Sequence, residues 1–229
     1  MITFEHVSKR YEGGVRALQD VSFELGAGEM AFLTGHSGAG KSTLLRLILM
    51  LERPSGGRLG VNGRDLCATP SRHAPRVRQQ IGMIFQDHKL LQEKSVFDNV
   101  ALPLLIAGLP YAEVKRRVHA ALDMVGLLER EQSWPQMISG GEQQRVGIAR
   151  AIVGMPPVLL ADEPTGNLDP ELSRGLFDLF QQLNEQGVTV LIASHDLALI
   201  RSMGQRVLVL SDGILVDDIA GSEIGGARS

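Results

Sequence analysis

The chain has a single cysteine and no long apolar run. Cys67 has no second thiol with which to form a disulfide bond or a cysteine-based zinc site, and its polar neighbours indicate a loop. Residues 102–109 are apolar but are interrupted by Pro103 and Gly108, far short of the ~20 residues that span a bilayer. Residues 1–6 lack the basic and then apolar pattern of a targeting signal. These absences predict a protein that stays in the cytosol.

The chain also has few lysines and little net charge. Lysine supplies only five of the 23 basic residues, and the formal net charge is −3. This balance argues against a protein devoted to nucleic-acid binding, although it does not exclude a local basic patch. Apolar residues make up 44% of the 229 residues, which is enough for the core of one large domain or of a domain with a lobe.

What the chain does have is a glycine-rich segment with a strong pattern. Residues 35–42 read Gly-His-Ser-Gly-Ala-Gly-Lys-Ser and fit the phosphate-loop pattern G-x-x-x-x-G-K-[ST]. Residues 30–33 predict a buried strand before it, and residues 43–49 predict a helix after it, a context that disfavours a chance glycine-rich turn. Glycines let backbone N–H groups approach phosphate oxygens, and a helix N-terminus adds positive partial charge. In this pattern Lys41 reaches the β- and γ-phosphates, and the Ser42 hydroxyl is a ligand for Mg²⁺.

Two acidic residues follow a second apolar strand. Residues 158–161 lead directly into Asp162 and Glu163. Catalytic groups of open α/β sheets gather at the carboxyl ends of strands. We expect Asp162 to hold Mg²⁺, directly or through water, and Glu163 to polarise the water that attacks the γ-phosphorus. Alone, the pair would indicate only a charged turn, but beside a phosphate loop it indicates nucleotide hydrolysis.

A helix is predicted to begin at Ser139. Ser139 is a good N-cap residue, and Glu142, three positions later, completes a capping-box pattern. The same helix start offers free N–H groups and a hydroxyl, which together form an anion site. The segment is therefore a well-capped helix and, on the functional interpretation, also a second phosphate contact.

The remaining pattern predicts an α/β fold. Alternating apolar and polar residues predict strands at 2–7 and 21–25. The turn signals Gly56-Gly57 and Asn62-Gly63 bracket a short strand at 58–61, and residues 81–85 predict a buried strand. Later segments alternate between strand and helix, which implies a mostly parallel sheet with helices on its faces. The predicted helices are 95–106, 112–125, 140–153, 170–184 and 197–202, and the later strands are 158–161, 188–193 and 206–210. Residues 221–229 predict a disordered tail of small residues.

Over nearly its whole length the chain resembles the nucleotide-binding subunits of ABC-type ATPases. Residues 138–143 resemble the signature motif of that family, with Ile138 in place of the usual leucine. Further matches are Tyr11 at the adenine-stacking position, Gln86 at the Q-loop, residues 167–169 at the D-loop and His195 at the switch histidine.

The resemblance implies one ABC ATPase domain over residues 1–229. Its α/β fold would have a mostly parallel core sheet flanked by helices, an N-terminal antiparallel β part and a helical lobe. The implied parts are a nucleotide-binding core at 1–86 and 156–219, a lobe with the signature motif at 87–155, and a tail at 220–229.

The resemblance also implies the site residues, with ATP and Mg²⁺ as cofactors. Nucleotide contacts would come from Tyr11, Gly35, His36, Ser37, Gly38, Ala39, Gly40, Lys41, Ser42, Thr43, Gln86, Asp162 and His195, and from Ser139, Gly140 and Gly141 of a second subunit. Mg²⁺ would be held by Ser42, Gln86 and Asp162, and catalysis would use Glu163, His195, Lys41 and Gln86. Two subunits would pair head to tail in the presence of ATP, and Asp169 would couple the two sites.

Within the family, the chain most resembles the ATP-binding subunits of bacterial cell-division complexes. The resemblance is carried by residues 32–41, 82–91 and 96–104, and most of all by His36 and by Asp87-His88. It implies an integral membrane partner of the FtsX type, other division proteins as further partners, and control of cell-wall hydrolysis. The implied place is the cytoplasmic face of the bacterial inner membrane, at the division septum, and no nucleic-acid partner is expected.

Alternative functions remain open at this point. Lipoprotein-releasing and macrolide-export ATPases share residues 161–169, so that motif cannot separate them from the cell-division group. ABC ATPases that act on DNA carry a long insertion between the Q-loop and the signature, but Gln86 and Ser139 are only 53 positions apart (139 − 86). A scaffold that binds nucleotide without hydrolysis is disfavoured by the intact Lys41 and Glu163.

A membrane partner's short cytoplasmic helix would need an apolar groove, which this family places beside the Q-loop. The apolar residues best placed to line it are Leu90, Leu91, Val96 and Phe97. Each of them could instead belong to the core of the helical lobe.

Overall fold

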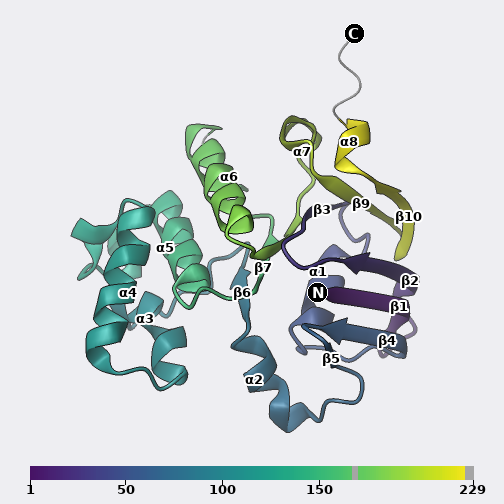
Figure 1. Ribbon diagram of the computed structural model, residues 1–229, viewed down its shortest axis with the longest axis horizontal. Helices are drawn as coiled ribbons and strands as arrows, with labels where there is room; N and C mark the ends of the chain where they lie inside the picture. The colour runs from purple at the N-terminus through teal and green to yellow at the C-terminus, as the bar shows by residue number, and fades with distance from the viewer. Residues whose placement is uncertain (167–169, 225–229) are drawn as a thin grey trace. The chain divides into compact units, whose positions relative to one another are not determined.

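The structure is a computed structural model that describes residues 1–166 and 170–224 (Figure 1). The chain divides into two compact units. The first comprises Met1–Arg78 and Gln181–Ser229, and the second comprises Gln79–Phe180. Within the described ranges, no helix is both long enough and apolar enough to cross a membrane.

The first unit begins with an antiparallel sheet whose strand order is β2-β1-β4-β5. Its strands are β1 (Ile2–Arg10), β2 (Arg16–Leu25), β4 (Gly56–Val61) and β5 (Arg64–Asp65). Phe4 and Phe23 pair across β1 and β2 with stacked rings 4.7 Å apart. The turn between β4 and β5 is Asn62-Gly63, with φ values of 53° and 72°, as the Asn-Gly signal predicts.

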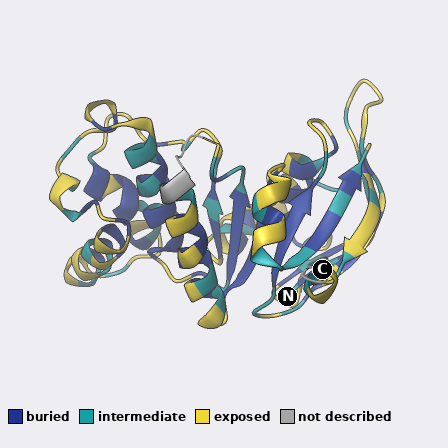
Figure 2. Cartoon of the chain, turned by 90° about the horizontal axis from the view of Figure 1, so that it is seen from above, coloured by how far each residue is buried: buried dark blue, intermediate teal, exposed yellow. Residues whose placement is uncertain are grey.

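The same unit contains buried parallel strands (Figure 2). β3 (Met30–Thr34) lies between β8 (Thr189–Ala193) and β9 (Arg206–Ser211) and is parallel to both. Every residue of β3 and β8 is buried, which explains why both strands are apolar, apart from one threonine at an end of each, instead of alternating. The short helices α1 (Lys41–Ile48), α2 (Ala74–Arg78) and α7 (Leu197–Met203) also belong to this unit.

The last strand, β10 (Ile214–Ile219), is absent from the sequence-based prediction. It pairs antiparallel with β9 after a tight turn. Arg206 of β9 donates to both carboxylate oxygens of Asp218 on β10, at 2.8 and 2.7 Å. β10 is largely exposed, and two acidic residues interrupt its apolar residues, so its sequence gives a weaker strand signal than the buried strands.

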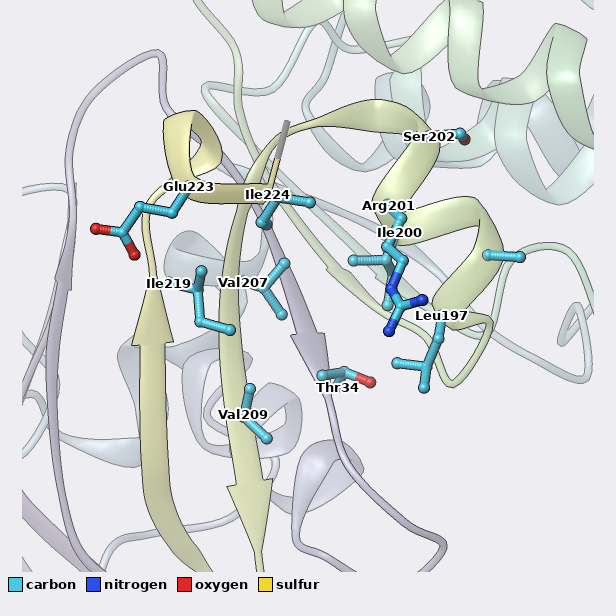
Figure 3. Close-up of a pocket in the computed structure, with 11 residues that line it drawn as sticks. Thr34, Leu197, Ile200, Arg201, Ser202, Val207, Val209, Ile219, Glu223 and Ile224 are labelled. Atoms are coloured by element: carbon cyan, nitrogen blue, oxygen red, sulfur yellow. The ribbon is translucent and has the colours of Figure 1, made fainter. Parts of the chain in front are cut away.

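The prediction of a disordered tail from residue 221 is wrong for its first part. Gly221–Ile224 forms a short helix, α8. Ile224 lies near Val207 and Ile219 and helps to line an apolar cavity of about 790 Å³ that also borders α7 (Figure 3). A single apolar residue among small ones gives a weak signal, and the tertiary contact decides its structure.

The second unit pairs two parallel strands with long helices. β6 (Ile81–Ile84) and β7 (Val158–Asp162) lie side by side, with Ile84 opposite Ala161. The helices are α3 (Val96–Ile106), α4 (Tyr111–Met124), α5 (Gly140–Ile152) and α6 (Pro170–Glu185), and the boundary between the units falls within α6. α5 contacts α3, α4 and β6 and is therefore the central helix of this unit.

The four helices predicted at 95–106, 112–125, 140–153 and 170–184 are all present, with ends that differ by one residue. Ser95 caps α3 because its hydroxyl accepts a hydrogen bond from the Asp98 amide at 3.1 Å. The division into a core and a lobe at 87–155 stays a prediction.

Candidate functional site

The phosphate loop follows β3 and contains three glycines with left-handed φ values, two of which have no room for a side chain. Gly35, Gly38 and Gly40 have φ values of 148°, 82° and 110°. A Cβ atom on Gly35 would lie 2.1 Å from the Leu210 carbonyl oxygen, and one on Gly40 would lie 2.6 Å from the Ala17 carbonyl oxygen. Gly38 faces open space, since a Cβ there would meet nothing within 4 Å. The loop therefore packs against other backbone at Gly35 and Gly40 and is open to a ligand at Gly38.

Lys41, the first residue of α1, lies across this loop. Its side chain is buried, and its ammonium group donates to the Gly35 carbonyl oxygen at 2.6 Å and to the His36 carbonyl oxygen at 3.2 Å. α1, all of whose residues are described, has neither a side-chain cap nor an acidic residue in its first turn. Its first N–H groups and its positive dipole end are thus available to an anion, and the arrangement fits a phosphate group.

A turn that the sequence analysis missed supports the loop from behind. Asp212 and Gly213, between β9 and β10, have φ values of 49° and 80°. The Gly213 amide donates to the Ala39 carbonyl oxygen at 3.0 Å, and the Gly213 carbonyl accepts from the Gln19 amide at 2.7 Å. His36 Nε2 lies 3.3 Å from Asp212 Oδ1. The Asp-Gly dipeptide between apolar strands was the signal that could have revealed this turn.

The structure brings Tyr11 to the phosphate-loop helix. The Tyr11 hydroxyl lies 3.4 Å from the Thr43 hydroxyl, and the Lys9 ammonium lies 4.8 Å from the centre of the Tyr11 ring. His195 is exposed and follows β8, which is parallel to β3. It therefore leaves the sheet at the same edge as the phosphate loop.

In the second unit, the structure brings together the ends of two strands that carry predicted catalytic residues. Asp162 is the last residue of β7, and Gln86 follows β6 by two residues. Because β6 and β7 are parallel and in register at their ends, Gln86, Asp162 and Glu163 leave the pair at the same edge. Glu163 has a φ of 48°, a left-handed conformation that is uncommon for a residue with a side chain. The predicted D-loop, residues 167–169, lies outside the described residues.

The signature segment forms the capping box that its sequence predicts. The Glu142 amide donates to the Ser139 hydroxyl at 3.2 Å, and Glu142 Oε2 accepts from the Ser139 amide at 2.8 Å. The hydrogen bond from the Ser139 amide is the main reason that the pKa of Glu142 lies below its usual value. A Cβ atom on Gly140 would meet nothing within 4 Å, so this helix start is open to a ligand. The phosphate contact itself stays a prediction.

Two further residues of α5 hold the turns that carry Glu163 and Gln86, and sequence reasoning missed both. Gln144 is buried, and its amide nitrogen donates to the Pro164 carbonyl oxygen at 2.7 Å. Arg150 donates to the carbonyl oxygens of His88 and Lys89. The sequence carries no signal for either contact, because both side chains bond to backbone carbonyl groups that lie far away in the chain.

The metal site, predicted at Ser42, Gln86 and Asp162, stays a prediction. Within residues 1–166 and 170–224, no group of three or more His, Cys, Asp or Glu side chains could by itself hold a metal ion. Mg²⁺ in nucleotide sites is typically bound by one or two protein oxygens together with substrate phosphates. Ser42 and Asp162 would suit that role.

The predicted partner groove needs correction. Val96, Phe97 and Leu90 are buried, and the Phe97 ring packs edge-on against His119 at 6.1 Å. These three residues belong to the core of the second unit, Val96 and Phe97 from the start of α3 and Leu90 from the loop before it. Leu91 alone is exposed, at 37%, and the buried side chain of Asn99 holds its backbone through two hydrogen bonds.

Comparison with known proteins gives consistent results. Residues 18–166 match the family described as "ABC transporter". The chain is 60% identical over 215 residues to "Cell division ATP-binding protein FtsE" of Escherichia coli (strain K12), covering 94% of this chain and 97% of that protein. It is 42% identical over 225 residues to the protein of the same name from Bacillus subtilis (strain 168), covering 98% and 99%.

A solved structure extends the comparison to three dimensions. A dimeric ATP-binding cassette in a post-hydrolysis state, bound to ADP and Pi, has a TM-score of 0.91 to this chain at 32% identity, covering 96% of this chain and 98% of that one. The α/β architecture is therefore shared over nearly the whole length.

Proposed function

The chain belongs to the ABC transporter family, and from that premise we propose that it is the ATP-hydrolysing subunit of a membrane complex that acts in bacterial cell division. The observation that carries the nucleotide part is the phosphate loop. Gly35 and Gly40 pack closely against neighbouring backbone, whereas Gly38 faces open space. The ammonium group of Lys41 is held among the carbonyl oxygens of the loop. The name shared by the two relatives supports the division part.

The residues of the chain divide the chemical work in the proposed mechanism. Backbone N–H groups at the start of α1 hold the phosphates, and Lys41 exchanges its bonds to Gly35 and His36 for bonds to phosphate oxygens. Mg²⁺, held through Ser42 and Asp162, would neutralise phosphate charge as the reaction proceeds. Glu163 accepts a proton from the attacking water, and Gln86 orients that water.

ATP hydrolysis is tested by two substitutions that act on different steps. Glu163→Gln removes the base and leaves the phosphate loop intact, so nucleotide binding should persist while turnover falls by about 10²–10³-fold. Lys41→Ala should weaken nucleotide binding itself. The exposed Glu129 has no assigned role, so Glu129→Gln is the matched control in the ATPase and nucleotide-binding assays. Wild-type turnover in Glu163→Gln would remove Glu163 from catalysis.

The division role is tested in the native cell. Depletion of the protein should give filaments with unsplit septa, and wild-type protein should restore division while Glu163→Gln should not. Normal division, with lipoproteins accumulating at the inner membrane, would instead assign the chain to the lipoprotein-releasing group. Normal division with export of macrolides lost would assign it to the macrolide-export group.

A further inference from the structure

Helix α5 presents one face to the two turns that follow β6 and β7. Gln144, Gly147 and Arg150 are spaced three residues apart, so each is the neighbour of the next on the helix surface. Gln144 donates to the carbonyl oxygen of Pro164, one residue after Glu163. A Cβ atom on Gly147 would lie 3.8 Å from the carbonyl oxygen of His88, two residues after Gln86. The face is thus packed against the backbone of both turns.

Arg150 makes two hydrogen bonds to the turn after β6. Its Nη1 donates to the Lys89 carbonyl oxygen at 2.8 Å, and its Nη2 donates to the His88 carbonyl oxygen at 2.5 Å. A guanidinium group suits this task because its donors form a rigid planar fork. The Arg150 side chain is partly buried, and this burial lowers its pKa. A buried cation is costly unless it is hydrogen-bonded, so these two bonds are important to the local structure.

The turn to which Arg150 donates has an unfavourable backbone conformation. His88 and Lys89 have φ values of 57° and 48°, two successive left-handed residues with side chains. Such conformations persist only where surrounding contacts impose them. His88 Nδ1 is also buried without a hydrogen-bond partner among the described residues, so this side chain does not supply the missing restraint. The His88 amide donates to the Phe85 carbonyl oxygen at 3.2 Å within the turn, and the two bonds from Arg150 restrain the turn from outside it.

We propose that Arg150 is a positioning residue for Gln86, because it fixes the backbone of the turn in which Gln86 lies. The proposal rests on the role of Gln86 in the proposed function. Ser139 is the N-cap of α5. The proposed role of Arg150 therefore makes this helix a rigid link between the signature segment and the Q-loop of the same subunit. Displacement of the signature would then reach Gln86 through Arg150.

The test is a double-mutant cycle in the full-length chain. Arg150→Lys keeps the charge and most of the volume but loses the fork. We expect kcat for ATP hydrolysis to fall by about ten- to a hundredfold, since small misplacements of a catalytic group cost rate in that range. KM for ATP should stay within about twofold, because the phosphate loop is unchanged. In a Gln86→Ala background, Arg150→Lys should have no further effect on kcat.

Arg145→Lys is the matched control. Arg145 lies on the same helix and donates to the Val125 carbonyl oxygen at 3.2 Å, away from the Q-loop turn. It should leave kcat unchanged. An equal loss in Arg145→Lys, or an equal loss from Arg150→Lys with and without Gln86, would overturn the proposal, because either result would indicate a general effect on the helix.

Amide hydrogen exchange separates the positioning of the turn from the role of Gln86. Arg150→Lys should accelerate exchange of amides 86–90 at least about tenfold relative to Arg145→Lys. Unchanged exchange would overturn the proposal. Wild-type kcat in Gln86→Ala alone would instead show that the proposed role of Gln86 has failed, and positioning of a catalytic group by Arg150 would fall with it.

Discussion

At the residue scale, the phosphate loop depends on glycines that lie so close to other backbone atoms that a side chain would clash there. Gly213 illustrates this outside the recognised motif. A Cβ atom there would lie 2.8 Å from the Ala17 carbonyl oxygen, and the Gly213 amide and carbonyl hold Ala39 and Gln19. The loop therefore depends on a glycine 173 positions beyond its last glycine, Gly40 (213 − 40).

Gly213→Ala should lower both stability and nucleotide affinity. The substitution adds left-handed strain and a backbone clash, which together should cost about 2–4 kcal/mol of unfolding free energy. Gly63→Ala is the matched control, since Gly63 has a φ of 72° but no atom within 4 Å of a Cβ. It should cost only about 1 kcal/mol and leave nucleotide affinity unchanged. Urea unfolding and nucleotide titration measure both quantities, and equal effects of the two variants would contradict the contact argument.

Residue identity predicted the local part of the site but not its long-range supports. Lys41, Ser139 and Glu163 stand in short patterns whose chemistry depends on neighbours in sequence. Arg150 acts on carbonyl groups 61 and 62 positions away, and any backbone carbonyl could have been its partner. A hydrogen bond to backbone leaves no complementary residue in the sequence from which it could be inferred.

At the scale of the element, α5 combines a strong local signal with a central place in its unit. Its capping box was predictable because the Ser139 and Glu142 bonds lie within one turn. α8 and β10 were missed for the opposite reason, since their stability comes from a cavity-lining residue and an ion pair, respectively. Elements with a self-contained signal can be predicted, whereas elements defined by tertiary contacts cannot.

The capping box gives α5 a stability that depends on pH. The folded pKa of Glu142 is depressed, so its contribution is fully present above the unfolded pKa of about 4.3 and is lost as the pH falls through the lower folded pKa. We expect Glu142→Gln to unfold at lower urea than wild type at pH 7. The difference should shrink steadily below about pH 4.5. A gap that is constant from pH 7 to pH 3.5 would show that the charge of Glu142 contributes nothing.

At the scale of the whole molecule, we predict that two copies of this chain pair head to tail when ATP is bound. Ser139 begins a helix whose anion site belongs, by resemblance, to nucleotide on a partner copy, and the solved relative is dimeric. Glu163→Gln with ATP should therefore elute as a dimer on a sizing column. Adding Ser139→Arg should return it to a monomer, because a long side chain would fill the open helix start. A double variant that stays dimeric would place the contact elsewhere.

Docking of the FtsX-type partner can be tested on the one groove residue that is exposed. Leu91→Glu should abolish co-purification with the membrane subunit and spare basal ATPase activity, since Leu91 makes no part of the phosphate site. Ile106 is 61% exposed at the opposite end of α3, about 15 Å along the helix from its start, so Ile106→Glu is the matched control. Loss of docking in Ile106→Glu with normal docking in Leu91→Glu would move the interface to the far end of the helix.

The contacts of α5 with the two turns have a consequence for how this protein can change over evolutionary time. Gln144 and Arg150 donate only to main-chain carbonyl oxygens of the two turns, namely those of Pro164, His88 and Lys89. These hydrogen bonds therefore do not depend on which side chains most positions of the turns carry. Asp87 and Lys89 are exposed and can be exchanged without loss of these hydrogen bonds. Substitutions can therefore change the exposed side chains beside Gln86 while the backbone path of the turn is kept.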